Sequence, residues 1–89
     1  MKIKLELFGA SRDFSNKEFL EFNIKQKMEI KDFRKEVINY LDKNFRGNEN
    51  FIKIVKNSVF CSEDNNIIND DFVIIKNQKI GIIPPIGGG

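Results

Sequence analysis

The sequence ends in Ile80-Gly81-Ile82-Ile83-Pro84-Pro85-Ile86-Gly87-Gly88-Gly89, a strand-like apolar run followed by two prolines and a glycine tract. Proline fixes φ and has no N–H to donate, so neither proline suits a central strand. Pro85 also favours an extended backbone at Pro84. We therefore expect a strand that stops near Ile83, a domain of residues 1–83, and an extended tail of residues 84–89.

This tail predicts a carboxylate that is delivered to another protein. Six extended residues reach about 20 Å, and glycine has no Cβ, so other groups can approach its backbone closely. The group at the end is the α-carboxylate of Gly89. A tolerant chain end or a flexible linker is the alternative explanation for a glycine run. A linker, however, does not need two prolines at its root.

Length and composition indicate one small domain. The chain has 89 residues, of which 40% are hydrophobic and 31% are charged. A chain of this size buries one core and has little room for an internal active site. The formal net charge of +2 is too small to favour nucleic acid as a partner. Because no apolar run approaches the length of a membrane span, we expect a cytoplasmic protein that binds neither nucleic acid nor membranes.

The rarest residue types argue against catalysis by this chain alone. The sequence has no His and a single cysteine, Cys61. An intramolecular disulfide, a cysteine metal cluster and the Ser/His and Cys/His nucleophile pairs are therefore excluded, and we expect no metal site. A lone Cys in an apolar segment is more often a small buried hydrophobe than a persulfide acceptor or redox thiol. The neighbouring pair Asp70-Asp71 is typical of a solvated turn.

The first half of the chain predicts two strands and a helix. Residues 2–7 alternate charged and apolar side chains, which places Ile3, Leu5 and Leu7 inward and Phe8 outward. After a loop over residues 9–16, a second alternating run at residues 20–24 completes a hairpin. Spacings of three and four then predict a helix from Ile30 that ends before Gly47, with the apolar stripe Ile30, Phe33, Val37, Leu41 and Phe45.

The second half predicts several short strands. Residues 51–55 read as a buried strand, residues 56–58 as a turn and residues 59–61 as a short apolar segment before a turn-rich loop. Residues 72–75 and 80–83 are two further apolar runs that suit a hairpin. The order of elements favours an α+β fold with a mixed sheet on one main helix. The β-grasp (ubiquitin-like) arrangement fits best, with the first and last strands side by side at the centre.

With this architecture and ending, the chain resembles the small subunit of molybdopterin synthase, a sulfur carrier of the ubiquitin-like superfamily. Two stretches carry the resemblance, Leu7-Phe8-Gly9-Ala10-Ser11-Arg12-Asp13 and Ile82-Ile83-Pro84-Pro85-Ile86-Gly87-Gly88-Gly89. Members of the family have a strand that ends in Phe, followed by a small residue and an Arg. They finish with Pro-Pro, an aliphatic residue, a small residue and Gly-Gly, which here are Ile86, Gly87, Gly88 and Gly89.

The resemblance implies a cycle of carboxylate chemistry at Gly89 and no permanently bound cofactor. An ATP-dependent activating enzyme adenylates the C-terminal glycine, and sulfur then replaces AMP to give a thiocarboxylate. The large subunit of molybdopterin synthase receives the tail, Pro84, Pro85, Ile86, Gly87 and Gly88 included, and uses the sulfur to build molybdopterin from a pyranopterin precursor. In this interpretation the partner supplies the catalytic groups of the sulfurtransferase.

A partner must also bind the body of the protein, because ordering a glycine tail costs about 1–2 kcal/mol per residue. The resemblance places the docking residues at Phe8, Val59 and Ile83; the alternative is that they complete the core or sit singly on the surface. Arg12 is expected to position the tail or a partner carboxylate, with a plain surface charge as the alternative. Phe8 is also outward by strand parity. Two alternatives stay open at this point: a sulfur carrier for thiamin or tRNA thiolation, and a non-catalytic ubiquitin-like binding module.

Overall fold

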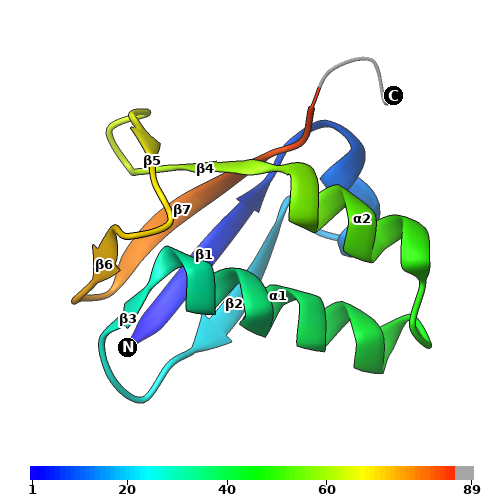
Figure 1. Cartoon of the computed structure of the whole chain (residues 1–89), viewed down its shortest axis with the longest axis horizontal. Helices are drawn as coiled ribbons and strands as arrows, with labels where there is room; N and C mark the ends of the chain where they lie inside the picture. Colours follow the sequence, from blue (N-terminus) through cyan, green and yellow to red (C-terminus); the bar gives the residue numbers. More distant parts are fainter. Residues whose placement is uncertain (86–89) are drawn as a thin grey trace.

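The computed structural model describes residues 1–85, which form a mixed sheet with helices on one side (Figure 1). The chain contains seven strands, two α-helices and a 3-10 helix within these residues. In order they are β1 (Lys2–Leu7), η1 (Gly9–Phe14), β2 (Phe19–Asn23), β3 (Met28–Glu29), α1 (Ile30–Asn44), α2 (Glu49–Asn57), β4 (Val59–Cys61), β5 (Ile67–Ile68), β6 (Val73–Ile74) and β7 (Gln78–Ile83).

The main sheet has the strand order β2-β1-β7-β4-β5, so the first and last long strands are neighbours at its centre. β1 is antiparallel to β2 and parallel to β7, with Leu5 opposite Leu20 in one pair and Ile80 in the other. β4 pairs antiparallel with β7. The predicted central pairing of first and last strands is therefore confirmed, and it brings the C-terminal strand to the middle of the sheet.

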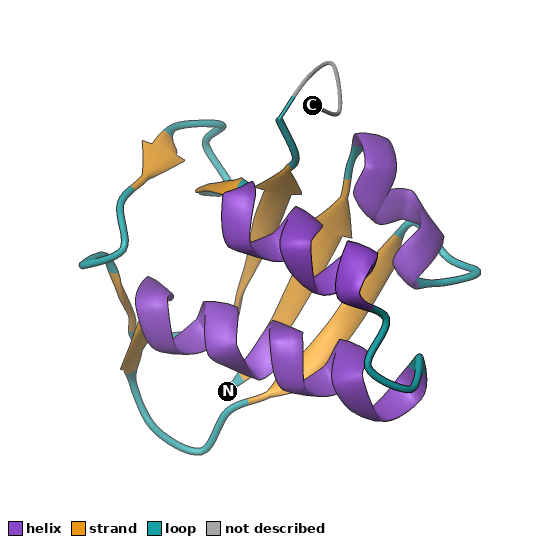
Figure 2. Ribbon diagram, turned by 45° about the vertical axis from the view of Figure 1, so that its right-hand side comes forward, coloured by secondary structure: helices purple, strands orange, loops and turns teal. Residues whose placement is uncertain are grey.

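Both α-helices cover the same face of this sheet (Figure 2). The buried side of α1 is the stripe predicted from its spacing, since Ile30, Phe33, Val37 and Leu41 are all fully buried. Gly47, with φ of +70°, follows the end of α1 as expected for a helix terminator. The alternating residues of β1 and β7 complete the core from the sheet: Ile3, Leu5, Leu7, Ile80 and Ile82.

The strand predicted over residues 51–55 is wrong, because this segment lies in helix α2. Asn48 caps the helix, its side chain accepting a hydrogen bond from the Phe51 backbone N–H at 3.1 Å. Phe51, Ile54 and Val55 then have the three- and four-residue spacing of one helix face, and they contact the core. A dense apolar run in a short segment does not distinguish a buried strand from a helix.

The hairpin predicted between residues 72–75 and 80–83 is also wrong. β6 pairs with the short strand β3 in a separate two-stranded sheet, while β7 pairs with β1 and β4. The segment before β6 instead completes the start of α1, which has no side-chain cap. The backbone N–H groups of Ile30 and Lys31 donate to the carbonyls of Phe72 and Asp70 at 2.9 and 3.0 Å. Free donors at a helix N-terminus need such acceptors.

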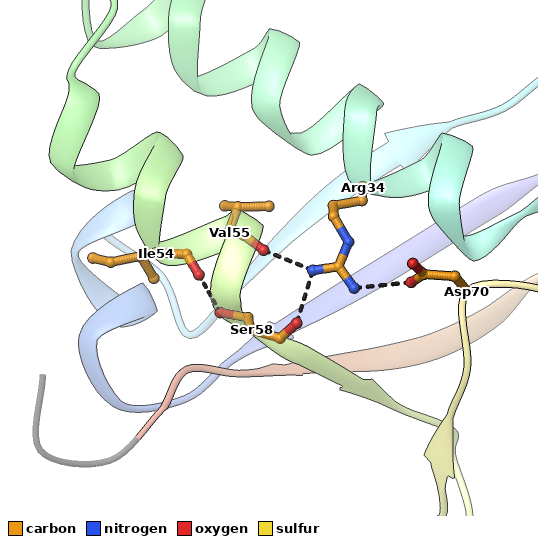
Figure 3. Close-up of polar contacts among 5 residues, drawn as sticks. All are labelled: Arg34, Ile54, Val55, Ser58 and Asp70. Atoms are coloured by element: carbon orange, nitrogen blue, oxygen red, sulfur yellow. Dashed lines mark hydrogen bonds and ion pairs between the residues drawn. The ribbon is translucent and has the colours of Figure 1, made fainter. Parts of the chain in front are cut away.

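Arg34 joins α1 to the junction between α2 and β4 (Figure 3). Its Nη1 donates to the carbonyl oxygens of Val55 and Ser58, both at 2.7 Å, and its Nη2 pairs with Asp70 at 3.0 Å. The guanidinium also stacks over the ring of Phe60, 4.8 Å from its centroid. Cations suit the carbonyl-rich C-terminus of a helix. Arg34 thereby fixes the point at which α2 ends and β4 begins.

Candidate functional site

The face of the main sheet opposite the helices carries a group of exposed apolar side chains. Ile80 and Ile82 point into the core, so alternation turns Ile83 outward, and Val59 lies directly opposite Ile83 in the β4–β7 pair. Phe8 and Val59 are 40% and 44% exposed, and Ile83 is half-buried. The three residues predicted for docking are therefore on one surface. Their role in docking stays a prediction.

Ile67 extends this surface and was not anticipated. It lies opposite Cys61 in the β4–β5 pair and is 60% exposed. Contiguous exposed apolar groups usually mark an interaction site. We call Phe8, Val59, Ile67 and Ile83 the apolar face. The sequence signal for Ile67 was weak, because two isoleucines between polar residues do not show which one faces the solvent.

Phe8 is placed by the turn that follows β1. The segment predicted as a loop over residues 9–16 contains η1, and its Ser11 is fully buried. The Ser11 hydroxyl accepts from the Phe8 N–H at 2.9 Å and donates to the Phe8 carbonyl at 2.6 Å. Phe14 fills the core beneath, its ring centroid 5.0 Å from that of Phe51. The backbone of Phe8 is thus held at both polar groups.

Charged pairs accompany the apolar face. Glu6 and Lys79, on neighbouring strands of the same side of the sheet, form an ion pair at 3.2 Å. Arg12, predicted to assist docking, lies in η1 and pairs with Glu18 at 3.3 Å with its side chain 57% exposed. An exposed pair of this kind contributes little to stability. Arg12 therefore has a surface position from which a partner can reach it.

The root of the predicted tail lies at the end of the sheet where η1 begins. β7 ends at Ile83, as expected from the two prolines. Pro84 is buried and its ring lies beside Gly9. A Cβ added to Gly9 would lie 3.8 Å from the Pro84 Cδ. Pro85 is exposed. The ring of Pro84, the first residue of the predicted tail, therefore packs onto the domain.

The remaining tail residues, Ile86, Gly87, Gly88 and Gly89, lie outside the described residues. The predictions that concern them, including the reactive carboxylate of Gly89, are therefore not tested by the structure.

Other locations offer less chemistry. A hollow of about 700 Å³ lies between β2 and the C-terminal half of α1, lined by aromatic residues and by Asp13, Lys17 and Glu21. Residues 1–85 contain no group of three acidic, His or Cys side chains that would hold a metal ion. Within the same residues, no helix has the length and apolar character of a membrane span. Cys61 is 6% exposed, in agreement with the buried position predicted for it.

Solved structures of other proteins have an architecture similar to that of this chain. The chain is similar over 96% of its length to a protein from Pyrococcus furiosus described as molybdopterin converting factor, subunit 1, with a TM-score of 0.69, 15% identity and 98% of that chain covered. The chain has the β-grasp fold. The α+β class and the β-grasp arrangement expected from the sequence are therefore confirmed.

A second structure of the same fold is SAMP1 from Haloferax volcanii. It matches with a TM-score of 0.68 and 10% identity, and the match covers both chains completely. No protein-family profile matches the sequence, and no curated protein matches it. At these identities the likeness shows the β-grasp fold and not the activity, so the function must be argued from the residues.

Proposed function

We propose that the chain is a sulfur carrier that acts as the small subunit of molybdopterin synthase. Gly89 carries the reactive group, residues 84–88 bring it to the partner, and the apolar face binds the partner. The observation that carries the proposal is the position of the apolar face at the root of the tail: Ile83 belongs to the face and is followed directly by Pro84 and Pro85.

The chemistry requires two substitutions at the Gly89 carboxyl group. In the first, a carboxylate oxygen attacks the α-phosphorus of ATP on an activating enzyme, and pyrophosphate leaves. In the second, sulfide attacks the acyl carbon of the adenylate, AMP leaves with the former carboxylate oxygen, and a thiocarboxylate remains. Glycine suits both steps because no side chain obstructs the carbonyl. The sequence has no His, the commonest general acid–base residue, and we assign the acid–base groups to the partners.

The free-energy cost of ordering the tail supports a role for the apolar face in binding the partner. Ordering three glycines costs about 1–2 kcal/mol each, so a tail of this kind binds weakly by itself. Burying about 200 Å² of apolar surface contributes about 5 kcal/mol, which is similar to that cost. The exposed side chains of Phe8, Val59 and Ile67 are well suited to supply such an area.

Support for the molybdopterin route comes from the Pro-Pro ending and from the fold likeness to molybdopterin converting factor, subunit 1. That protein is a subunit, which implies a partner chain for it. We assign the large subunit of molybdopterin synthase as the equivalent partner here, and an ATP-dependent enzyme as the partner that activates Gly89.

Reconstitution tests this assignment. The thiocarboxylated chain, mixed with the cognate large subunit and the cyclic pyranopterin precursor, is expected to yield molybdopterin. A chain that lacks Gly88 and Gly89 is the matched control, and it should keep its fold and lose all product. Formation of the thiocarboxylate without any molybdopterin would overturn the assigned route. Sulfur found instead in a thiamin intermediate or in tRNA would support the corresponding alternative carrier.

A further inference from the structure

One residue of strand β7 allows an unusually close approach of two side chains. A Cβ built on Gly81 would lie 2.6 Å from the Cys61 Sγ and 2.9 Å from the Phe8 Cε2. Real Cβ atoms essentially never have neighbours nearer than 3.0 Å. The Phe8 ring and the Cys61 sulfur therefore occupy the space that any other residue at position 81 would need.

The register explains how the three residues meet. Gly81 lies opposite Cys61 on β4 and opposite Glu6 on β1, two residues before Phe8. Phe8 thus reaches from the end of β1 across β7, over the position where a side chain is missing. Because Ser11 holds both polar backbone groups of Phe8, the ring is fixed from the backbone side as well.

We propose that Gly81 is a positioning residue for partner binding, which seats the Phe8 ring against β7 as part of the apolar face. This inference rests on the proposed function, because it assigns Phe8 a role in binding the large subunit. A side chain at position 81 lifts the Phe8 ring from the sheet and changes the shape that the partner meets. Gly81 itself then acts through Phe8.

Local stability does not account for the glycine. Glycine in a strand interior weakens the strand, because it costs more conformational entropy and offers no side chain for packing. β7 is otherwise rich in isoleucine, with Ile80, Ile82 and Ile83 around position 81. A close approach of other groups is the remaining reason for a glycine here. The one competing role is to make room for the Cys61 sulfur alone.

A double-mutant cycle tests the proposal. Gly81→Ala and Phe8→Ala are each expected to raise the Kd for the cognate large subunit about tenfold, as for residues in the centre of an interface. Gly81→Ala combined with Phe8→Ala is expected to bind no more weakly than Phe8→Ala alone, because the glycine acts through the ring. Independent, multiplied effects would overturn the proposal, since residues that do not interact give additive free energies.

Cys61→Ala is the matched control, because it removes the other neighbour of position 81 and leaves the Phe8 ring in place. Alone it should leave the Kd within about twofold of the wild-type value. The double variant Gly81→Ala with Cys61→Ala should still bind about tenfold more weakly than the wild type. If circular dichroism shows that Gly81→Ala alone does not fold, this double variant takes its place in the cycle. Wild-type affinity in this pair would overturn the proposal, because Gly81 would then serve only the sulfur.

The outcome separates this inference from the proposed function. If the wild-type chain does not bind the large subunit, the proposed function fails and this inference fails with it. If the wild-type chain binds and Gly81→Ala binds equally well, only the positioning role fails. In the isolated chain, nuclear Overhauser contacts between the Gly81 α-protons and the Phe8 ring should be present in the wild type. Their absence would contradict the seating of the ring directly.

Discussion

The two faces of the main sheet use the same strands for different purposes. Neighbouring residues of β4 show the contrast: Phe60 is completely buried beneath the helices, whereas Val59 is 44% exposed on the opposite side. β7 repeats the pattern, with Ile82 in the core and Ile83 outside it. The covered face is apolar because α1 and α2 lie on it. The open face carries the residues of the apolar face beside charged side chains such as Lys4 and Lys79.

Side chains on the covered face stabilise the fold, whereas side chains on the open face are available for contacts with another molecule. Alternation in a strand makes every second residue available for a task other than the core. Farther from the tail, the open face carries Lys4 and the Glu6–Lys79 ion pair, as a solvated sheet surface should. Near the tail it carries Phe8, Val59 and Ile83. Apolar residues gathered toward this end of the open face are the basis for the interface proposed above.

The largest effect on stability is expected for Phe60→Ala. Phe60 is fully buried and contacts the Phe33 ring at a centroid distance of 6.0 Å, so truncation leaves a cavity in the core. The free energy of unfolding should fall by about 3–5 kcal/mol, measured by urea denaturation. Val59→Ala, one residue away, is the matched control and should change stability by about 0.5 kcal/mol or less. Equal losses in the two variants would contradict the division between the faces.

An intermediate effect is expected for Arg34→Met. The substitution keeps most of the side-chain volume and removes the donors that satisfy the Val55 and Ser58 carbonyls, so it should cost about 2 kcal/mol of unfolding free energy. Asp70→Asn is the control, because it weakens only the exposed side of the contact and should cost about 1 kcal/mol or less. Thermal denaturation of both variants measures the difference. A loss for Asp70→Asn as large as that for Arg34→Met would show that the ion pair, not the helix end, matters.

The smallest effect on folding is expected for Ile67→Ser, which changes the open face alone. Ile67 is 60% exposed, so stability should change by about 0.5 kcal/mol or less. Binding to the large subunit should nevertheless weaken by about threefold to tenfold, because the substitution removes apolar area that the partner would bury. Calorimetric titration with the large subunit measures this change in Kd. Ile75→Ser is the control, because Ile75 is similarly exposed at 66% but lies outside the apolar face. If both substitutions weaken binding to the large subunit equally, the apolar face has no specific role in that binding.

Long regular elements were predictable from the sequence because their side chains have a clear period. The inward set of β1 and the buried stripe of α1 followed from alternation and from three- and four-residue spacing. The central position of the last strand followed from the β-grasp arrangement that the order of elements favoured. The outward position of Phe8 followed in the same way. These features depend on local pattern, which a single sequence records well.

The second half was less predictable because tertiary contacts decide it. Residues 51–55 are apolar at almost every position, so the helical period of α2 was visible only together with the Asn48 cap. β3 has two residues, and no sequence pattern links Met28 to its partner Ile74. At the candidate site, the signals for Val59 and Ile83 came from the family resemblance, whereas Gly81 was indistinguishable from any glycine in a strand. Its close contacts with Phe8 and Cys61 appear only in three dimensions.

The most direct test of the central claim is the intact mass of the chain after incubation with ATP, the activating enzyme and sulfide. The account predicts a mass gain equal to one oxygen-to-sulfur exchange, located by fragmentation at Gly89 and absent when Gly88 and Gly89 are deleted. An unchanged mass with an enzyme that is active on its own carrier, or sulfur located on Cys61 instead, would contradict it.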